Sequence, residues 1–120
     1  MAGRAMASAP RGPKLPKATS VPEATFLQCW KAIGGKAPVT EMQFHQDRKW
    51  RWDFAWPEVR LAIEIQGGIW AKGGHSSGKG ITRDCEKFGA AAILKWHVIP
   101  MTPDQITPAY LEEIREAFGL

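Results

Sequence analysis

Cysteine is scarce in this chain, which has only Cys29 and Cys85 among its 120 residues. No CxxC pair or Cys/His ligand spacing occurs, which argues against a zinc site. Two isolated cysteines without a secretory signal favour reduced, buried thiols and a cytoplasmic protein. No apolar run approaches the roughly 18 residues that a membrane-spanning helix needs, so we expect no membrane partner. The length fits one domain.

Acidic residues are missing from the N-terminal region. The first acid of the chain is Glu23, and the residues before it carry all of the +4 excess charge. That region is also rich in Pro, Ala and Gly and has no apolar periodicity, so we expect residues 1–21 to form a basic disordered tail. Such a tail can lie along a polyanion, or it can serve only to keep the protein soluble. Residues 22–120 are the predicted folded domain.

Hydrophobic periodicity predicts a mixed α/β fold, with a central sheet and helices packed on it. A first helix is expected from Pro22 or Glu23, with Ser20 as a possible cap, and the pair Gly34-Gly35 ends it. A helix capped by Thr82 is expected over 82–96, with a buried strand at 97–101. Thr102 and Gln105 have capping-box spacing before a final amphipathic helix. The expected strands are 41–47, 50–56 and 60–66.

The segment from Trp50 to Gln66 is the most informative part of the sequence. Large apolar residues alternate with polar or small ones on both sides of the turn at 57–59. Alternation of period two predicts an antiparallel hairpin with one buried face. With residues 58 and 59 at the tip, Asp53 lies opposite Glu64.

Two acids directly opposite each other destabilise a sheet, unless a cation lies between them. A shared divalent cation therefore explains the pair Asp53 and Glu64. Gln66 projects from the same face as Glu64 and can position water or donate to a phosphate. The alternative is that both acids lie on the solvated face of an ordinary amphipathic hairpin.

The arrangement of acids resembles the PD-(D/E)XK nucleases. That family has a leading helix with an acid, then Asp, then about ten residues, then Glu-x-Lys or a variant; here the matching residues are Glu23, Asp53 and Glu64-Ile65-Gln66. The runs RKWRWDFAWPEVRLAIEIQGG and RDCEKFGAAAILKWHVIP resemble small phage and bacterial nucleases related to very-short-patch repair endonucleases. The resemblance covers residues 22–106.

The resemblance implies a restriction-endonuclease-like fold and metal-dependent hydrolysis of DNA. It implies Mg²⁺ or Mn²⁺ held by Asp53, Glu64 and the Ile65 carbonyl, with Glu23 orienting water or a second metal. The family's usual Lys is replaced here by Gln66. Lys87 or Arg83 of the next helix is then expected to supply the cation that stabilises developing charge.

Further candidates surround this core of acids. His75, in a glycine-rich loop over 71–81, is a candidate general acid/base or phosphate contact; a solvent-exposed loop histidine is the alternative. The following residues are expected to contact nucleic acid: Arg48, Lys49, Arg51, Ser76, Ser77, Lys79 and Arg83. A solvated charged face or a plain flexible loop would have the same composition.

The sequence therefore predicts a metal-dependent DNA endonuclease of the cytoplasm, in a bacterium or a phage-infected cell. Selectivity for branched or mismatched DNA, as in a junction resolvase, is one expectation. A catalytically weak or inactive DNA-binding module of the same fold is the alternative, and the loss of the family's Lys is its best support. A purely structural subunit, in which the hairpin acids are merely exposed, is a third reading. The sequence leaves monomer and homodimer open.

Overall fold

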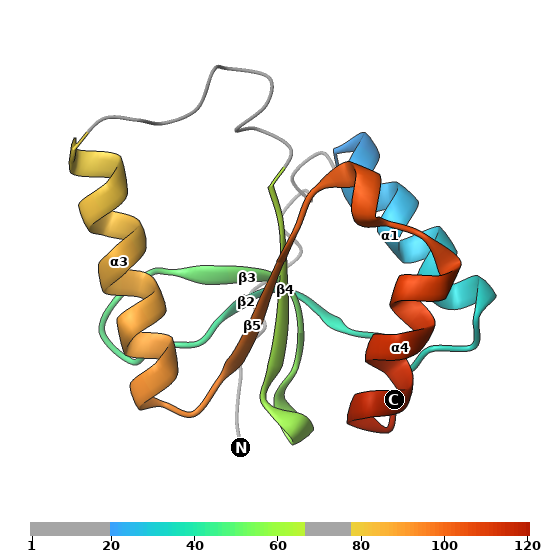
Figure 1. The fold of residues 1–120 in the computed structure, drawn as a ribbon. Helices are drawn as coiled ribbons and strands as arrows, with labels where there is room; N and C mark the ends of the chain where they lie inside the picture. Colours follow the sequence, from blue (N-terminus) through green and yellow to red (C-terminus); the bar gives the residue numbers. More distant parts are fainter. Residues whose placement is uncertain (1–19, 67–77) are drawn as a thin grey trace, which may run out of the picture.

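The computed structural model describes residues 20–66 and 78–120, which form a four-stranded sheet with helices on both faces (Figure 1). The predicted residues His75, Ser76 and Ser77 lie outside the described residues. The elements, in chain order, are α1 Val21–Ala32, β2 Val39–Gln43, β3 Arg51–Trp56, η1 Pro57–Val59, β4 Leu61–Ile65, α3 Gly78–Ile93, β5 His97–Met101, η2 Pro103–Gln105 and α4 Pro108–Phe118.

The sheet has the strand order β2-β3-β4-β5. The first two pairings are antiparallel, and β4 pairs with β5 in parallel. The parallel pair is possible because α3 crosses over between these strands. The mixed sheet with packed helices that the sequence predicts is confirmed.

Helices α1 and α4 cover one face of the sheet, and α3 covers the other (Figure 1). On the first face the core contains Phe26, Trp30, Phe54, Trp56 and Leu111, among others. Fully burying each such side chain stabilises the fold by about 1.5–3 kcal/mol. This apolar layer fixes α1 against the sheet, and with it the position of Glu23 in the first turn of α1.

The second face has a smaller core made of Trp52, Ala55, Ala62, Ala91 and Trp96. The prediction of a single buried face is therefore wrong, because Trp52 packs on one face of the sheet and Phe54 and Trp56 pack on the other. Both faces of β3 lie under helices, so the alternation of large and small residues reflects the space available on each side rather than exposure to solvent. The change of face between Trp52 and Phe54 falls at Asp53.

The start of the domain is well specified by its sequence. Ser20 caps α1, and a reciprocal bond from its own N–H to the Glu23 carboxylate completes a capping box. The helix begins at Val21, one residue before the expected Pro22. It ends at the two glycines: Gly34 has a φ of +83°, and a Cβ on Gly35 would lie 2.3 Å from the Trp30 ring.

Helix α3 differs most from its prediction. It begins at Gly78, so Thr82 lies inside the helix rather than at its cap. Ala91 is its one buried residue, whereas the apolar residues Cys85 and Phe88 are exposed. Both cysteines are free, but the prediction of buried thiols is wrong for Cys85. The helix thus begins four residues earlier than expected, at residues that were predicted to belong to the loop. It contacts the sheet through a short stretch of small residues, so most of its apolar side chains stay exposed.

The other differences are smaller. Strand β2 lies at Val39–Gln43, earlier than the expected 41–47. The Thr102–Gln105 capping box forms, but it caps η2, and α4 has its own cap at Thr107. Strand β5 is buried only at Met101, because it forms an edge of the sheet. Within the described ranges, no helix combines the length and the apolar character that crossing a membrane requires.

Candidate metal and nuclease site

Asp53 and Glu64 occupy the place where β3 and β4 separate. The backbone ladder between these strands ends at Phe54 and Ile63, so Asp53 and Glu64 are the next opposed pair. The Glu64 carboxylate accepts a hydrogen bond from the Asp53 N–H at 3.0 Å. In return, the Asp53 carboxylate accepts one from the Ile65 N–H at 2.8 Å. Each acid is thus locked to the opposite strand, and the predicted register is confirmed.

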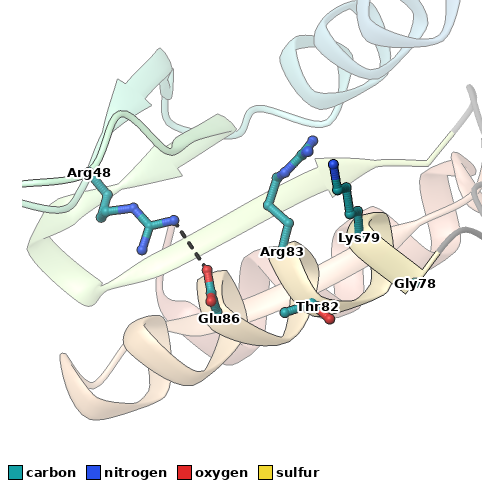
Figure 2. Close-up of a pocket in the computed structure, with 6 residues that line it drawn as sticks. All are labelled: Arg48, Gly78, Lys79, Thr82, Arg83 and Glu86. Carbon is teal, nitrogen blue, oxygen red and sulfur yellow. Dashed lines mark hydrogen bonds and ion pairs between the residues drawn. The ribbon is translucent and has the colours of Figure 1, made fainter.

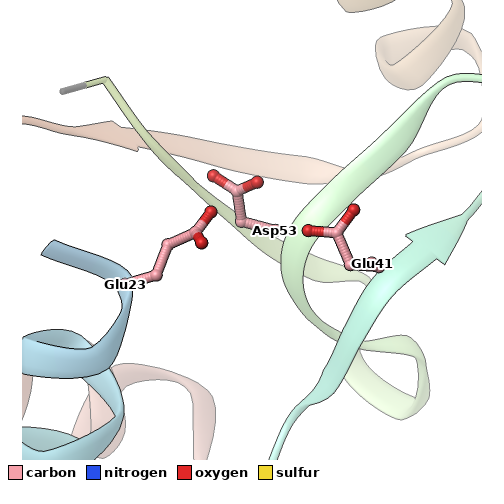
Figure 3. A group of neighbouring side chains, drawn as sticks. All are labelled: Glu23, Glu41 and Asp53. Atoms are coloured by element: carbon pink, nitrogen blue, oxygen red, sulfur yellow. The ribbon is translucent and has the colours of Figure 1, made fainter. Parts of the chain in front are cut away.

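Asp53 also meets two acids from other elements. One carboxylate oxygen each from Glu23, Glu41 and Asp53 lie within 4.8 Å of one another. Figure 3 shows the three side chains pointing toward a common centre, from α1, β2 and β3. All three are partly buried. The convergence matches what a bound cation needs: several oxygens, held by separate rigid elements.

Glu41 is the residue that the sequence analysis missed. The β2–β3 register pairs Thr40 with Phe54 and Met42 with Trp52, which places Glu41 opposite Asp53. Its backbone has a φ of 52°, a left-handed conformation that is unusual for a residue with a side chain. Only the register of β2 against β3 could have identified Glu41 from the sequence. That register could not be determined while the strand was expected at 41–47.

The environment of Asp53 opposes ionisation. Burial, followed by the repulsion of Glu64, raises the pKa of Asp53 from 3.8 to about 7. The hydrogen bond from Ile65 opposes this rise, and Glu23 and Glu41 contribute smaller parts of it. Near neutral pH this carboxyl is therefore poised between its two protonation states.

Lys87 of α3 reaches the opposite side of this pair of acids. Its Nζ lies 3.0 Å from Glu64 Oε1 and 2.9 Å from the Arg51 carbonyl oxygen. The side chains of Lys87 and Glu64 are only 16% and 14% exposed, so the ion pair is largely withdrawn from water. Burial nevertheless raises the pKa of Glu64, and Lys87 only partly offsets that rise. Lys87 also lies 4.7 Å from the centre of the Trp52 ring.

The positively charged side chain that was expected near the acids therefore comes from α3. Lys87, rather than Arg83, contacts Glu64. Gln66 is half-buried at the end of β4, and its N–H donates to the Met101 carbonyl at 2.8 Å. Glu64 lies outside the group of three acids, since its two oxygens face Lys87 and the Asp53 N–H. Whether the Ile65 carbonyl and Glu64 are metal ligands stays a prediction.

A second feature lies further along the same helix. A shallow groove of about 430 Å³ is lined by Arg48, Gly78, Lys79, Thr82, Arg83 and Glu86 (Figure 2). Three of the predicted nucleic-acid contacts, Arg48, Lys79 and Arg83, therefore come together there. Lys49 and Arg51 are exposed but do not line the groove.

Comparisons with known proteins add little about chemistry. No family model matches the chain, and no solved structure matches it. Two proteins of Mycobacterium tuberculosis, from strains CDC 1551 / Oshkosh and H37Rv, are each 32% identical to it over 73 residues. That match covers 58% of this chain and 26% of each relative, so the chain spans about a quarter of the relatives' length. Both relatives are described as uncharacterized proteins, so they indicate no activity for this chain.

Proposed function

We propose that this chain is a divalent-metal-dependent endonuclease that hydrolyses DNA phosphodiester bonds, with Asp53 at its centre. One observation carries the proposal: Asp53 shares a 4.8 Å cluster with Glu23 and Glu41, and Lys87 is held beside it through Glu64. A phosphodiester is anionic and resists attack by hydroxide, so its hydrolysis needs concentrated positive charge beside a bound water. Acids that hold a cation, with a lysine beside them, supply that charge.

The donor set fits Mg²⁺ or Mn²⁺. The three converging side chains offer only carboxylate oxygens, which hard divalent cations prefer, and no sulfur or imidazole ligand that would favour zinc. Asp53, Glu23 and Glu41 would hold the cation, with Glu64 and the Ile65 carbonyl as the further ligands that the family resemblance implies. A divalent cation bound there lowers the pKa of its water and polarises a phosphoryl oxygen.

The protein's own residues supply the remaining requirements. Lys87 carries a positive charge on the face of β4 toward α3, where it can stabilise charge that develops on a phosphoryl oxygen. Glu64 and the Arg51 carbonyl hold the ammonium group in place, so little reorganisation is needed when substrate binds. Lys87 thereby takes the role that the family's Lys has at the position of Gln66. Gln66 can orient water or donate to a phosphate oxygen.

A DNA-binding module with a weakened site is the second candidate. The observation that favours it is Gln66 itself, because the usual cation is absent from the strand and arrives from a helix instead. Selectivity for branched or mismatched DNA and a cytoplasmic location belong to the proposal, which leaves monomer and homodimer open. The free thiols agree with a reducing compartment.

A cleavage assay with EDTA, Mg²⁺ or Mn²⁺ tests the proposal. The substrates are supercoiled plasmid and matched linear, mismatched, branched and single-stranded DNA. We expect metal-dependent nicking that Asp53→Asn abolishes and Glu41→Gln reduces by at least about tenfold, whereas Glu113→Gln on α4 leaves it unchanged. Cleavage that survives Asp53→Asn, or its absence on every substrate with both metals, would overturn the endonuclease. DNA binding without cleavage would support the second candidate.

A further inference from the structure

The groove beside α3 gathers positive charge around a single acid. Lys79, Arg83 and Glu86 are spaced by four and three residues and therefore project from one side of the helix. Figure 2 shows the three side chains on the same side of α3, with Glu86 reaching Arg48, which comes from the segment before β3. Three cations against one carboxylate give the lining residues a net charge of +2, which suits an anionic ligand.

Arg48 is held by two contacts in this groove. Its Nη2 lies 3.2 Å from Glu86 Oε1, and its guanidinium carbon lies 3.9 Å from the centre of the Trp50 ring. The ion pair is exposed, with side chains 46% and 52% accessible to solvent. Exposed pairs of this kind change an equilibrium constant by at most about fivefold. The aromatic contact orients the guanidinium without using its donors, so the ion pair is the part that a ligand can replace.

We propose that this groove binds a phosphate of the nucleic-acid backbone. In the free protein Glu86 holds the Arg48 guanidinium in an ion pair, and the phosphate displaces the Glu86 carboxylate when it binds. A guanidinium can donate two parallel hydrogen bonds to a phosphate, whereas here the Glu86 carboxylate receives a single one. The displaced carboxylate returns to water at little cost because it is already exposed. Glu86 therefore orients Arg48 in the free protein and weakens the groove's affinity for polyanions.

A row of cations on α3 extends from the groove to Lys87, which contacts Glu64. Lys79, Arg83 and Lys87 are four residues apart, which places successive cations about 6 Å apart along one side of the helix. The last of the three contacts Glu64. A backbone bound at Arg48 and Arg83 would thus run toward Lys87 and Glu64. The identity of the ligand as nucleic acid rests on the proposed function, whereas the competition between Glu86 and an anion rests on the groove itself.

Fluorescence anisotropy of labelled duplex and single-stranded DNA, in EDTA and over a series of salt concentrations, tests this proposal. We expect Glu86→Gln to tighten binding about two- to fivefold at low salt. Arg83→Gln should weaken binding and reduce the slope of log K against log salt by about 0.9. Glu113→Gln makes the same charge change on α4, across the sheet, and should alter affinity by less than about 1.5-fold because of screening.

The proposal is wrong if Glu86→Gln binds no more tightly than Glu113→Gln, or if Arg83→Gln keeps the wild-type salt slope. Because EDTA prevents metal-dependent cleavage, these outcomes are independent of the endonuclease. A chain that shows the expected binding differences but cuts no DNA would refute the endonuclease alone. A chain that cuts DNA but is indifferent to Glu86→Gln would refute only the role of Glu86.

Discussion

Replacing Asp53 with asparagine should stabilise the metal-free protein at alkaline pH. The pKa of Asp53 is raised from 3.8 to about 7, so between these values the folded protein binds a proton that the unfolded chain does not. The stability that this carboxyl contributes is full below about pH 4 and is lost as the pH rises to about 7. Asparagine avoids the loss because it never ionises. Its side-chain oxygen can still accept the hydrogen bond from Ile65.

The magnitude follows from the width of that pH interval. At about 1.4 kcal/mol per pH unit, the interval corresponds to about 4 kcal/mol as an upper limit. Solvent reaches part of the Asp53 side chain, so we take about half of this value, about 2 kcal/mol. For a domain of this size, such a gain raises the melting temperature by roughly 10 °C. At pH 5 the gain should fall to less than half, because most of the interval still lies above that pH.

Thermal unfolding in EDTA at pH 5 and pH 8 measures this difference, with Asp104→Asn as the control at an exposed acid. Adding Mn²⁺ at pH 8 should stabilise the wild type and leave Asp53→Asn unchanged. The reasoning is refuted if Asp53→Asn is less stable than the wild type at pH 8, or if its gain is as large at pH 5.

Two other substitutions test separate contacts. Lys87→Gln leaves the carboxylate of Glu64 without its ion-pair partner, so we expect the free energy of unfolding, measured in urea, to fall by about 1–3 kcal/mol. Metal-dependent cleavage should fall by at least about 100-fold. Unchanged cleavage would exclude a role of Lys87 in stabilising the developing charge. Trp56→Phe loses a hydrogen bond from Nε1 to the Lys36 carbonyl at 2.8 Å, whereas the buried Nε1 of Trp52 has no partner among the described residues. Trp56→Phe should therefore destabilise the protein more than Trp52→Phe, by about 1 kcal/mol, and the reverse order in the same unfolding assay would contradict this account.

Much of the central sheet could be predicted from local patterns. The spacing of residues around the turn at 57–59 fixed the opposition of Asp53 and Glu64, because hairpin register depends on the turn. The capping box at Ser20 and the glycines after α1 are local signals of the same kind. The faces of β3 were not predictable from alternation alone, since Trp52 packs under α3 while Phe54 packs under α1. That assignment depends on which helix covers each face.

Some residues of the candidate site could be predicted from the sequence and others could not. Glu23, Asp53 and Lys87 were identifiable from the order of acids and from the helix that follows them. Glu41 was not, because its approach to Asp53 depends on the β2–β3 register and on a left-handed backbone conformation that no local motif announces. The pairing of Arg48 with Glu86 joins residues 38 apart in sequence, and only the packing of α3 beside the β2–β3 segment brings them together.

Titration of the protein with Mn²⁺, followed by electron paramagnetic resonance, tests whether Asp53 and its neighbouring acids hold a divalent cation. We expect a single saturable Mn²⁺ site at neutral pH that is lost in Asp53→Asn, weakened in Glu41→Gln and retained in Asp104→Asn. A wild-type protein that binds no Mn²⁺, or an Asp53→Asn variant that binds it as tightly as the wild type, would contradict the claim.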